Sequence, residues 1–197
     1  HSNKIKSQFG LESLQIFYPE MKDTRTRFLK NVSTNYTITH GKFQYGVGAG
    51  YGERAPSVSE AYGFYLFNSF DGFDQIGNPN LKNEKALEGN AFVSFKNEKW
   101  TLKAETYYFH IMDYIISRPN SSFIPMTIGA NGVKVYTALD YATIYNVSLS
   151  NDYRINDKIN WNMKFIITKG IDSDKMNLPF MRPFSYATNV SYFDKKN

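Results

Sequence analysis

Polarity alternates from residue to residue in seven segments of this chain, and this pattern restricts the fold more than any other feature. In residues 43–51, for example, Phe43, Tyr45 and Val47 fall on one face while small and polar residues fall on the other. A period of two residues places alternate side chains on opposite faces of a β-strand. The alternating segments are residues 31–39, 42–52, 87–96, 100–107, 145–150, 161–168 and 184–192. No segment has a convincing helical period, so the sequence predicts an all-β fold.

Short and long connections alternate between these segments. Short polar turns fall at residues 40–41, 97–99 and 156–158, and long loops at about residues 53–83, 118–139 and 171–183. In an up-and-down antiparallel sheet, alternate connections lie at opposite ends of the strands. The sequence therefore places the short turns at one end of the sheet and the long loops at the other.

Bulky aromatic residues gather near the short-turn end, and by parity they lie on the apolar face. They are Phe43, Phe95, Trp100, Tyr153, Trp161 and Tyr192. In a soluble sandwich the apolar face points into a core, where aromatic residues have no reason to collect at one rim. In an outer-membrane barrel the apolar face meets lipid, and aromatic rings settle at the level of the headgroups. The pattern favours an antiparallel up-and-down transmembrane β-barrel over a soluble sandwich.

Composition and motif content argue against several function classes. The net charge of +5 comes from scattered basic residues without a basic run, which argues against nucleic-acid binding. No apolar run approaches the roughly 20 residues of a membrane-spanning helix. The chain contains no G-x-S-x-G motif and no nucleophile beside a base, so we expect neither catalysis nor a bound cofactor.

Metal-binding patterns are weak in this sequence. The histidines His1, His40 and His110 are isolated from one another and make no metal site that the sequence can identify. Loop carboxylates could hold calcium but do not match the EF-hand spacing, and gap-filling explains the nearby methionines better than a soft-metal role. These loop residues are Asp71, Asp74, Asp172, Asp174, Met176 and Met181. We therefore expect no metal site.

Four glycines, Gly46, Gly48, Gly50 and Gly52, fall on one face of the second alternating segment. Their strict period of two does not fit the G-x-G-x-x-G phosphate-binding motif. Glycine weakens a strand interior unless the sheet must bend or something approaches closely. Two interpretations stay open, which are barrel curvature and the packing of another body against the polar face.

The connection from Tyr51 to Glu84 is far longer than the usual loop of about four to six residues. Its aromatic content argues against disorder, and long ordered loops commonly carry function. Its first end reads R-x-P-S-x-x-E, formed by Arg54, Pro56, Ser57 and Glu60. Its second end reads G-N-P-x-L-K-x-E, formed by Gly77, Asn78, Pro79, Leu81, Lys82 and Glu84.

These two motifs, in this order and between two strands, resemble the signature region of TonB-dependent outer-membrane receptors. The family usually has Pro before the final Glu, whereas this chain has Asn83. The resemblance implies a barrel of about 22 strands with a globular plug in its lumen. Residues 1–197 would then be part of one such barrel domain, with no plug domain and no TonB box. Because the family tends to end in an aromatic residue, Asn197 suggests that terminal strands are missing.

The resemblance also implies a function, which is active transport through the outer membrane of a Gram-negative cell. Such a receptor takes up a scarce ligand, such as a metal chelate or siderophore, haem, cobalamin, copper or a glycan. Its partners would be outer-membrane lipid, the protein's own plug domain against the polar face, the TonB complex through an N-terminal box, and the ligand. The short turns would be periplasmic and the long loops extracellular. The alternatives are a passive outer-membrane porin and a soluble carbohydrate-binding β domain.

The motif residues and the centre of the long loop have different expected roles. We expect the motif residues to set the loop geometry, and Glu60 or Glu84 to pair with Arg54. These residues are Arg54, Pro56, Glu60, Asn78, Pro79, Leu81 and Glu84. The candidate ligand-binding residues are Tyr62, Phe64, Tyr65, Phe67, Phe70, Asp71, Phe73 and Asp74. Exposed aromatic residues suit closure over an apolar or chelated ligand, and packing against neighbouring loops explains them equally well.

Overall fold

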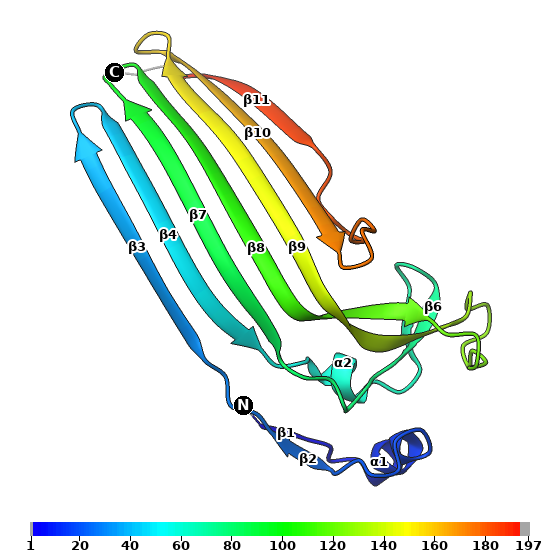
Figure 1. Ribbon diagram of the computed structural model, residues 1–197. Helices are drawn as coiled ribbons and strands as arrows, with labels where there is room; N and C mark the ends of the chain where they lie inside the picture. Colours follow the sequence, from blue (N-terminus) through cyan, green and yellow to red (C-terminus); the bar gives the residue numbers. More distant parts are fainter. Residues whose placement is uncertain (1, 194–197) are drawn as a thin grey trace. The chain divides into compact units, whose positions relative to one another are not determined.

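The main element of the protein is a sheet whose long strands follow one another in chain order. A computed structural model describes residues 2–193, so His1 and Asn197 lie outside the described part. Seven strands lie side by side in the sequence β3 (Asn31–His40), β4 (Phe43–Arg54), β7 (Glu84–Lys96), β8 (Trp100–Pro119), β9 (Val133–Arg154), β10 (Ile159–Asp172) and β11 (Ser185–Tyr192) (Figure 1). β10 pairs antiparallel with both β9 and β11. The predicted all-β, up-and-down arrangement is confirmed.

Four shorter strands stand apart from this series. β1 (Ser2–Lys4) pairs antiparallel with β2 (Thr24–Thr26). β5 (Leu66–Asn68) and β6 (Phe73–Ile76) form a hairpin inside the long loop, and β6 joins the start of β9 in parallel. The predicted loop over residues 118–139 is therefore too long, because residues 133–139 already belong to β9. β9 starts earlier than predicted because its first residues pair with β6. The local sequence pattern of β9 gives no sign of this distant partner.

β8 and β9 are the longest strands, with 20 and 22 residues. About 9–11 residues of a tilted strand are enough to cross the hydrocarbon layer of a membrane. β8 begins after the short turn over residues 97–99, and β9 ends before the short turn over residues 155–158. The surplus length of both strands therefore lies toward the long loops. This surplus carries the paired segment that receives β6.

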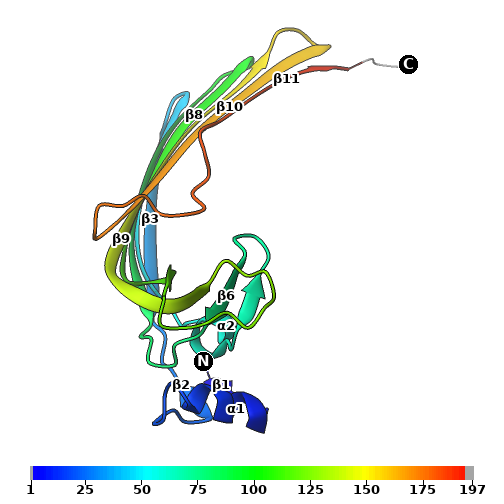
Figure 2. The same cartoon turned by 90° about the vertical axis from the view of Figure 1, so that its right-hand side faces the viewer.

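Two short helices correct the prediction that the chain has none. α1 (Gln8–Gln15) starts at Ser7, whose hydroxyl accepts a hydrogen bond from the Gly10 backbone N–H at 3.2 Å. α2 (Val58–Tyr62) lies within the long loop, beside β6 (Figure 2). Helices of eight and five residues contain too few turns to show a helical period. Within residues 2–193, neither helix has the length and apolar character needed to cross a membrane.

The described residues fall into two compact units. The first unit contains residues 2–30, 52–85 and 112–141, and the second contains residues 31–51, 86–111 and 142–193. Most buried apolar side chains belong to the first unit, namely Leu14, Met21, Ala61, Ile76, Leu81, Ile115, Val133 and Leu139. The strands of the second unit instead leave large apolar side chains exposed, among them Val32, Tyr36, Val47, Tyr145, Val147 and Val190. A sheet that faces lipid requires such an exposed apolar face.

The predicted aromatic residues near the short turns are neighbours on this apolar face. The rings of Phe43 and Phe95 are 5.0 Å apart between centroids, and those of Trp100 and Tyr153 are 5.3 Å apart. Trp161 lies opposite Tyr153 in the pairing of β9 with β10. The aromatic residues therefore form a band across neighbouring strands.

Two glycines of β4, Gly46 and Gly48, lie beneath side chains from the adjacent strands, whereas a Cβ at Gly52 would meet nothing within 4 Å. A Cβ atom at Gly46 would be 2.1 Å from the ring of Phe92 on β7. The Lys103 ammonium lies 4.9 Å from the centre of that ring and 2.5 Å from the Glu105 carboxylate. A glycine is therefore required at position 46 because the Phe92 ring occupies the space that a Cβ atom would need.

We predict that Gly46→Ala destabilises the second unit because the new methyl group overlaps the Phe92 ring. The expected loss is about 1–3 kcal/mol of unfolding free energy, measured by urea unfolding of the full-length protein in detergent micelles. Gly89→Ala is the matched control, since a Cβ there meets nothing within 4 Å. Phe92→Ala should rescue Gly46→Ala, and equal stability of the two single glycine variants would contradict the account.

Candidate ligand-binding loops

The first motif builds a capped helical turn at the start of the long loop. The Ser57 hydroxyl accepts a hydrogen bond from the Glu60 backbone N–H at 3.2 Å, and the Glu60 carboxylate accepts one from the Ser57 N–H at 2.6 Å. This reciprocal capping box satisfies two backbone donors that the start of a helix leaves unpaired. Pro56, immediately before the cap, is fully buried. The motif R-x-P-S-x-x-E therefore fixes where α2 begins.

Arg54, the last residue of β4, lies between two carboxylates. Its Nη1 atom is 2.8 Å from Glu60 Oε2, and its Nε atom is 2.5 Å from Glu84 Oε2. The other oxygen of Glu84 accepts a hydrogen bond from the Ile115 backbone N–H at 2.7 Å. Burial raises the pKa of Glu60, but hydrogen bonds from Arg54 and Ser57 outweigh this effect and hold that pKa below its ordinary value. Both expected pairings of Arg54 are present, and they join β4, α2, β7 and β8.

The second motif packs directly against the end of α2. The Gly77 backbone N–H donates to the Gly63 carbonyl at 2.7 Å, and the Asn78 N–H donates to the Glu60 carbonyl at 2.8 Å. A Cβ atom at Gly77 would be 2.5 Å from the Gly63 nitrogen and 2.6 Å from the Tyr62 nitrogen. Only glycine allows the two backbone segments to approach so closely. The two ends of the loop therefore meet each other.

Asn83, which stands where the family usually has proline, makes side-chain contacts that proline could not make. Its Oδ1 atom accepts a hydrogen bond from Arg27 at 3.2 Å. Its Nδ2 atom donates to the Phe28 carbonyl at 3.1 Å and to the Glu53 carboxylate at 3.2 Å. This departure from the motif connects the segment before β3 to the base of the loop.

The β5–β6 hairpin is joined to the loop over residues 120–132 by a buried carboxylate. Asp74 is fully buried, and its Oδ2 atom accepts backbone hydrogen bonds from Met126 at 2.8 Å and Thr127 at 2.9 Å. Burial raises the pKa of Asp74, but hydrogen bonds from Thr127 and Met126 outweigh it, so the pKa lies below its ordinary value. The ionised carboxylate therefore holds the two loops together.

Further contacts join the hairpin to the loop over residues 120–132 and to the start of β9, and Asp71 takes part in them. Its carboxylate is 2.7 Å from the Lys134 ammonium, which also lies 4.4 Å from the centre of the Phe73 ring. The Asn131 backbone N–H donates to the Gly72 carbonyl at 2.7 Å, and its side chain donates to the Asp71 carbonyl at 3.1 Å. The hairpin and the loop over residues 120–132 are thus connected at several points.

Four aromatic residues from three parts of the chain pack together in the first unit. The Phe17 ring stacks on Phe64 at 6.0 Å and meets the edge of Phe123 at 5.0 Å, while Phe64 and Tyr65 are 5.1 Å apart. Packing against neighbouring segments therefore accounts for Phe64 and Tyr65. Phe67 and Phe70 differ from them, because they remain 47% and 79% exposed on the hairpin.

The eight candidate residues are thus brought into one unit but not into one site. Tyr62 lines a cavity next to residues 20–25. Asp71 and Phe73 instead contact Lys134 of β9, and Asp74 accepts hydrogen bonds from the loop over residues 120–132. Sequence reasoning missed the segment before β3, which supplies Phe17 and the cavity wall. The alternating cations in T-R-T-R, residues 24–27, were the available signal.

The structure also shows what the other loop residues considered for metal binding contact. Within residues 2–193, no group of three or more His, Cys, Asp or Glu side chains gathers as metal ligands would. Asp172 accepts backbone hydrogen bonds from Asp174 at 3.0 Å and Met176 at 2.8 Å, which closes the turn after β10. The Met181 sulfur lies 2.7 Å from where a Cβ of Gly170 would be, so Met181 fills the space above that glycine.

Comparison with known proteins adds a family match over almost the whole chain. Residues 7–197 match the family model described as TonB dependent receptor-like, beta-barrel. No curated protein sequence matches the chain.

Solved structures share the fold. The copper transporter OprC superposes with a TM-score of 0.73 at 17% identity, covering 89% of this chain and 26% of OprC. The siderophore receptor PirA from Pseudomonas aeruginosa gives 0.55 at 14% identity, covering 85% of this chain and 36% of PirA. The FrpB iron transporter from Neisseria meningitidis gives 0.51 at 15% identity, covering 74% of this chain and 21% of FrpB. The chain therefore spans about a quarter of the length of OprC.

We predict that Arg54→Met loosens the base of the long loop, because it leaves Glu84 largely buried without its cationic partner. The expected cost is about 1–3 kcal/mol of local opening free energy, reduced from that of a fully buried pair because Arg54 is half exposed. Amide hydrogen exchange over residues 55–83 measures this cost. Arg182→Met, at an exposed position, is the control, and unchanged protection in Arg54→Met would refute the anchoring role.

Asp74 gives a pH-dependent prediction. A carboxyl whose folded-state pKa is depressed stabilises the structure above its unfolded-state pKa of about 3.9, and this stabilisation is lost as the pH falls through the folded-state value. We expect the protection factors of the Met126 and Thr127 amides to fall below about pH 4 in the wild type. In Asp74→Ala these protection factors should be low at every pH, by an amount equivalent to about 1–3 kcal/mol of opening free energy.

The matched control for Asp74→Ala is Asp71→Ala. That variant removes the ion pair with Lys134, whose side chains are 15% and 17% exposed, but it removes no hydrogen bond to the Met126 or Thr127 amides. The Met126 and Thr127 amides should keep their protection there. Equal protection in Asp74→Ala and the wild type would show that the carboxylate does not hold the loop.

Proposed function

Because this chain belongs to the TonB-dependent receptor β-barrel family, we propose that it forms part of the barrel wall and outer loops of a Gram-negative outer-membrane receptor. The receptor takes up a scarce ligand with energy from the TonB complex. In this arrangement the short turns face the periplasm, the long loops face the exterior, and the polar face meets the protein's own plug domain. Residues 1–197 are then one part of a single barrel domain.

The observation that carries the proposal is the β5–β6 hairpin with its two exposed phenylalanines. Phe67 and Phe70 stay exposed although Phe64 and Tyr65, a few residues away, pack against other segments. The hairpin is held by Asp74 and Asp71, so these rings are presented on a fixed support. Rigid presentation lowers the entropy cost of binding, and exposed aromatic rings suit contact with an apolar or chelated ligand.

The proposed ligand is a metal ion in chelated form, among the scarce ligands that such receptors take up. Solved structures with this fold carry the names copper transporter, siderophore receptor and iron transporter, which supports a metal-containing cargo. The capture step requires no bond chemistry from the chain. Its loops would bind the chelate, and transport would follow from movement of the plug.

Uptake by living cells tests the function. Accumulation of iron and copper chelates should fall when the gene is deleted, recover on complementation, and fall equally when TonB is removed. Dependence on TonB separates this receptor from a passive porin, whose transport would continue without it. Uptake of every tested ligand at wild-type rate in the deletion strain would overturn the proposal.

We predict that Phe67→Ser combined with Phe70→Ser weakens ligand capture about tenfold or more, because each lost aromatic contact costs about 1 kcal/mol. Binding of the transported chelate to whole cells measures the effect. Phe9→Ser is the control, since Phe9 is 74% exposed but lies in α1, outside the hairpin. Equal binding by the hairpin variant and the wild type would remove the two rings from the site.

A further inference from the structure

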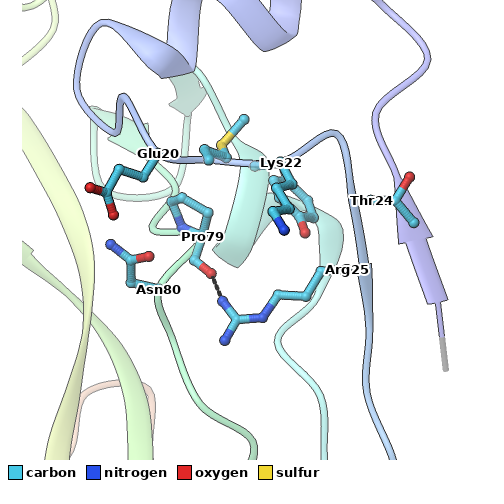
Figure 3. A pocket seen from close by; sticks show the side chains of 8 residues that line it. Glu20, Lys22, Thr24, Arg25, Pro79 and Asn80 are labelled. Carbon is cyan, nitrogen blue, oxygen red and sulfur yellow. Dashed lines mark hydrogen bonds between the residues drawn. The ribbon is translucent and has the colours of Figure 1, made fainter.

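A half-open cavity of about 220 Å³ lies beside α2, and the hairpin does not contribute to it. Three separate parts of the chain enclose it: residues 20–25, Tyr62 of α2, and the turn at Pro79 and Asn80 (Figure 3). An apolar cavity of about 150 Å³ is enough to hold benzene, so this one can hold a ligand group of similar size or somewhat larger. All of these residues belong to the first unit.

Two cations and one anion line this cavity. Figure 3 shows Lys22 and Glu20 beside the same space, with Arg25 reaching across it to the Pro79 carbonyl. Arg25 donates a hydrogen bond from Nη1 to that carbonyl oxygen. A carbonyl carries no net charge, so the bond positions the guanidinium without neutralising it. Among residues 2–193, neither Lys22 nor Arg25 forms an ion pair.

A third cation, outside the cavity lining, donates a hydrogen bond to Asn83. Arg27 follows Arg25 by two residues, and burial, followed by the charge of Arg25, lowers the pKa of Arg27 below its ordinary value. The charge of Arg25 therefore disfavours the charged form of Arg27. An anion bound at Arg25 would reduce this effect as well as complete the pairing of Lys22.

We propose that this cavity binds the carboxylate group of a small ligand, with Arg25 and Lys22 as its anion-binding residues. The planar guanidinium of arginine matches a carboxylate with two parallel hydrogen bonds, and an ammonium adds a point charge. Asn80 and Tyr62 line the same space, and an amide and a hydroxyl are groups that can complete the hydrogen bonding. Glu20 opposes the anion, so its charge limits affinity and disfavours ligands with a high negative charge.

This inference rests on the proposed function for its biological meaning, since the carboxylate would belong to the captured ligand. Binding to the cavity can nevertheless be measured without transport. The aromatic hairpin and the cavity then have separate roles, because Phe67 and Phe70 contact the apolar part of a ligand while Arg25 and Lys22 hold its charged group.

Calorimetric titration of the full-length receptor in detergent micelles tests the site, with glutarate as the probe and uncharged glutaramide as its isostere. We expect glutarate to bind and glutaramide not to bind. Arg25→Gln should weaken glutarate binding about tenfold or more, since hydrogen bonds between charged groups are the strong ones. Arg25→Lys should retain part of the binding, and Glu20→Gln should tighten it because a repulsive charge is removed.

Lys158→Gln is the control for net charge, because Lys158 lies in the short turn between β9 and β10, away from the cavity. It should bind glutarate like the wild type, and hydrogen exchange over residues 55–83 should show that the Arg25 variants keep their fold. Equal binding of glutarate and glutaramide, or unchanged binding in Arg25→Gln, would overturn the carboxylate site. Absence of glutarate binding in the wild-type receptor with normal TonB-dependent uptake overturns this inference alone, whereas wild-type binding of glutarate without TonB-dependent uptake overturns the proposed function alone.

Discussion

A backbone group within lipid must find its hydrogen-bond partner inside the protein, and most of this structure depends on that constraint. The seven long strands satisfy it by pairing in chain order, with short turns between them at one end. Irregular backbone and both described helices are confined to the segments outside this strand series. The apolar side chains then point outward from the sheet, as in Val32, Val47 and Val147, because lipid takes the place of a protein core.

The loops face the opposite problem, since in water they must build a core of their own. They do so with buried residues such as Leu14, Ile76 and Ile115, which come from widely separated parts of the chain. Arg54 is the charged centre of this arrangement, because its guanidinium binds Glu60 and Glu84. Ion pairs of this kind contribute less to stability than to specificity of arrangement, since burying charge costs free energy. The pairing thus joins the end of β4 to α2 and to the start of β7.

The strands, the aromatic band and the pairing of Arg54 could be predicted because each leaves a local mark in the sequence. α2 also left one, the S-x-x-E spacing of Ser57 and Glu60, which a search for helical periodicity overlooks in so short a helix. The remaining contacts had no such mark. Phe17 packs on Phe64, and Arg25 donates a hydrogen bond to Pro79, which lies 54 positions later in the sequence. A single sequence contains no record of contacts at that separation.

The exposure of the aromatic side chains in the long loop distinguishes those that stabilise the loop from those that are candidates for ligand binding. Burying an aromatic ring is favourable by about 2–3 kcal/mol, so rings that can reach a partner are expected to pack. Phe64 and Tyr65 do so against Phe17, whereas Phe67 and Phe70 stay exposed although their hairpin is firmly held. A fixed hairpin cannot bury these rings by local collapse. Further burial of these rings therefore requires another body, which is the role proposed above for the ligand.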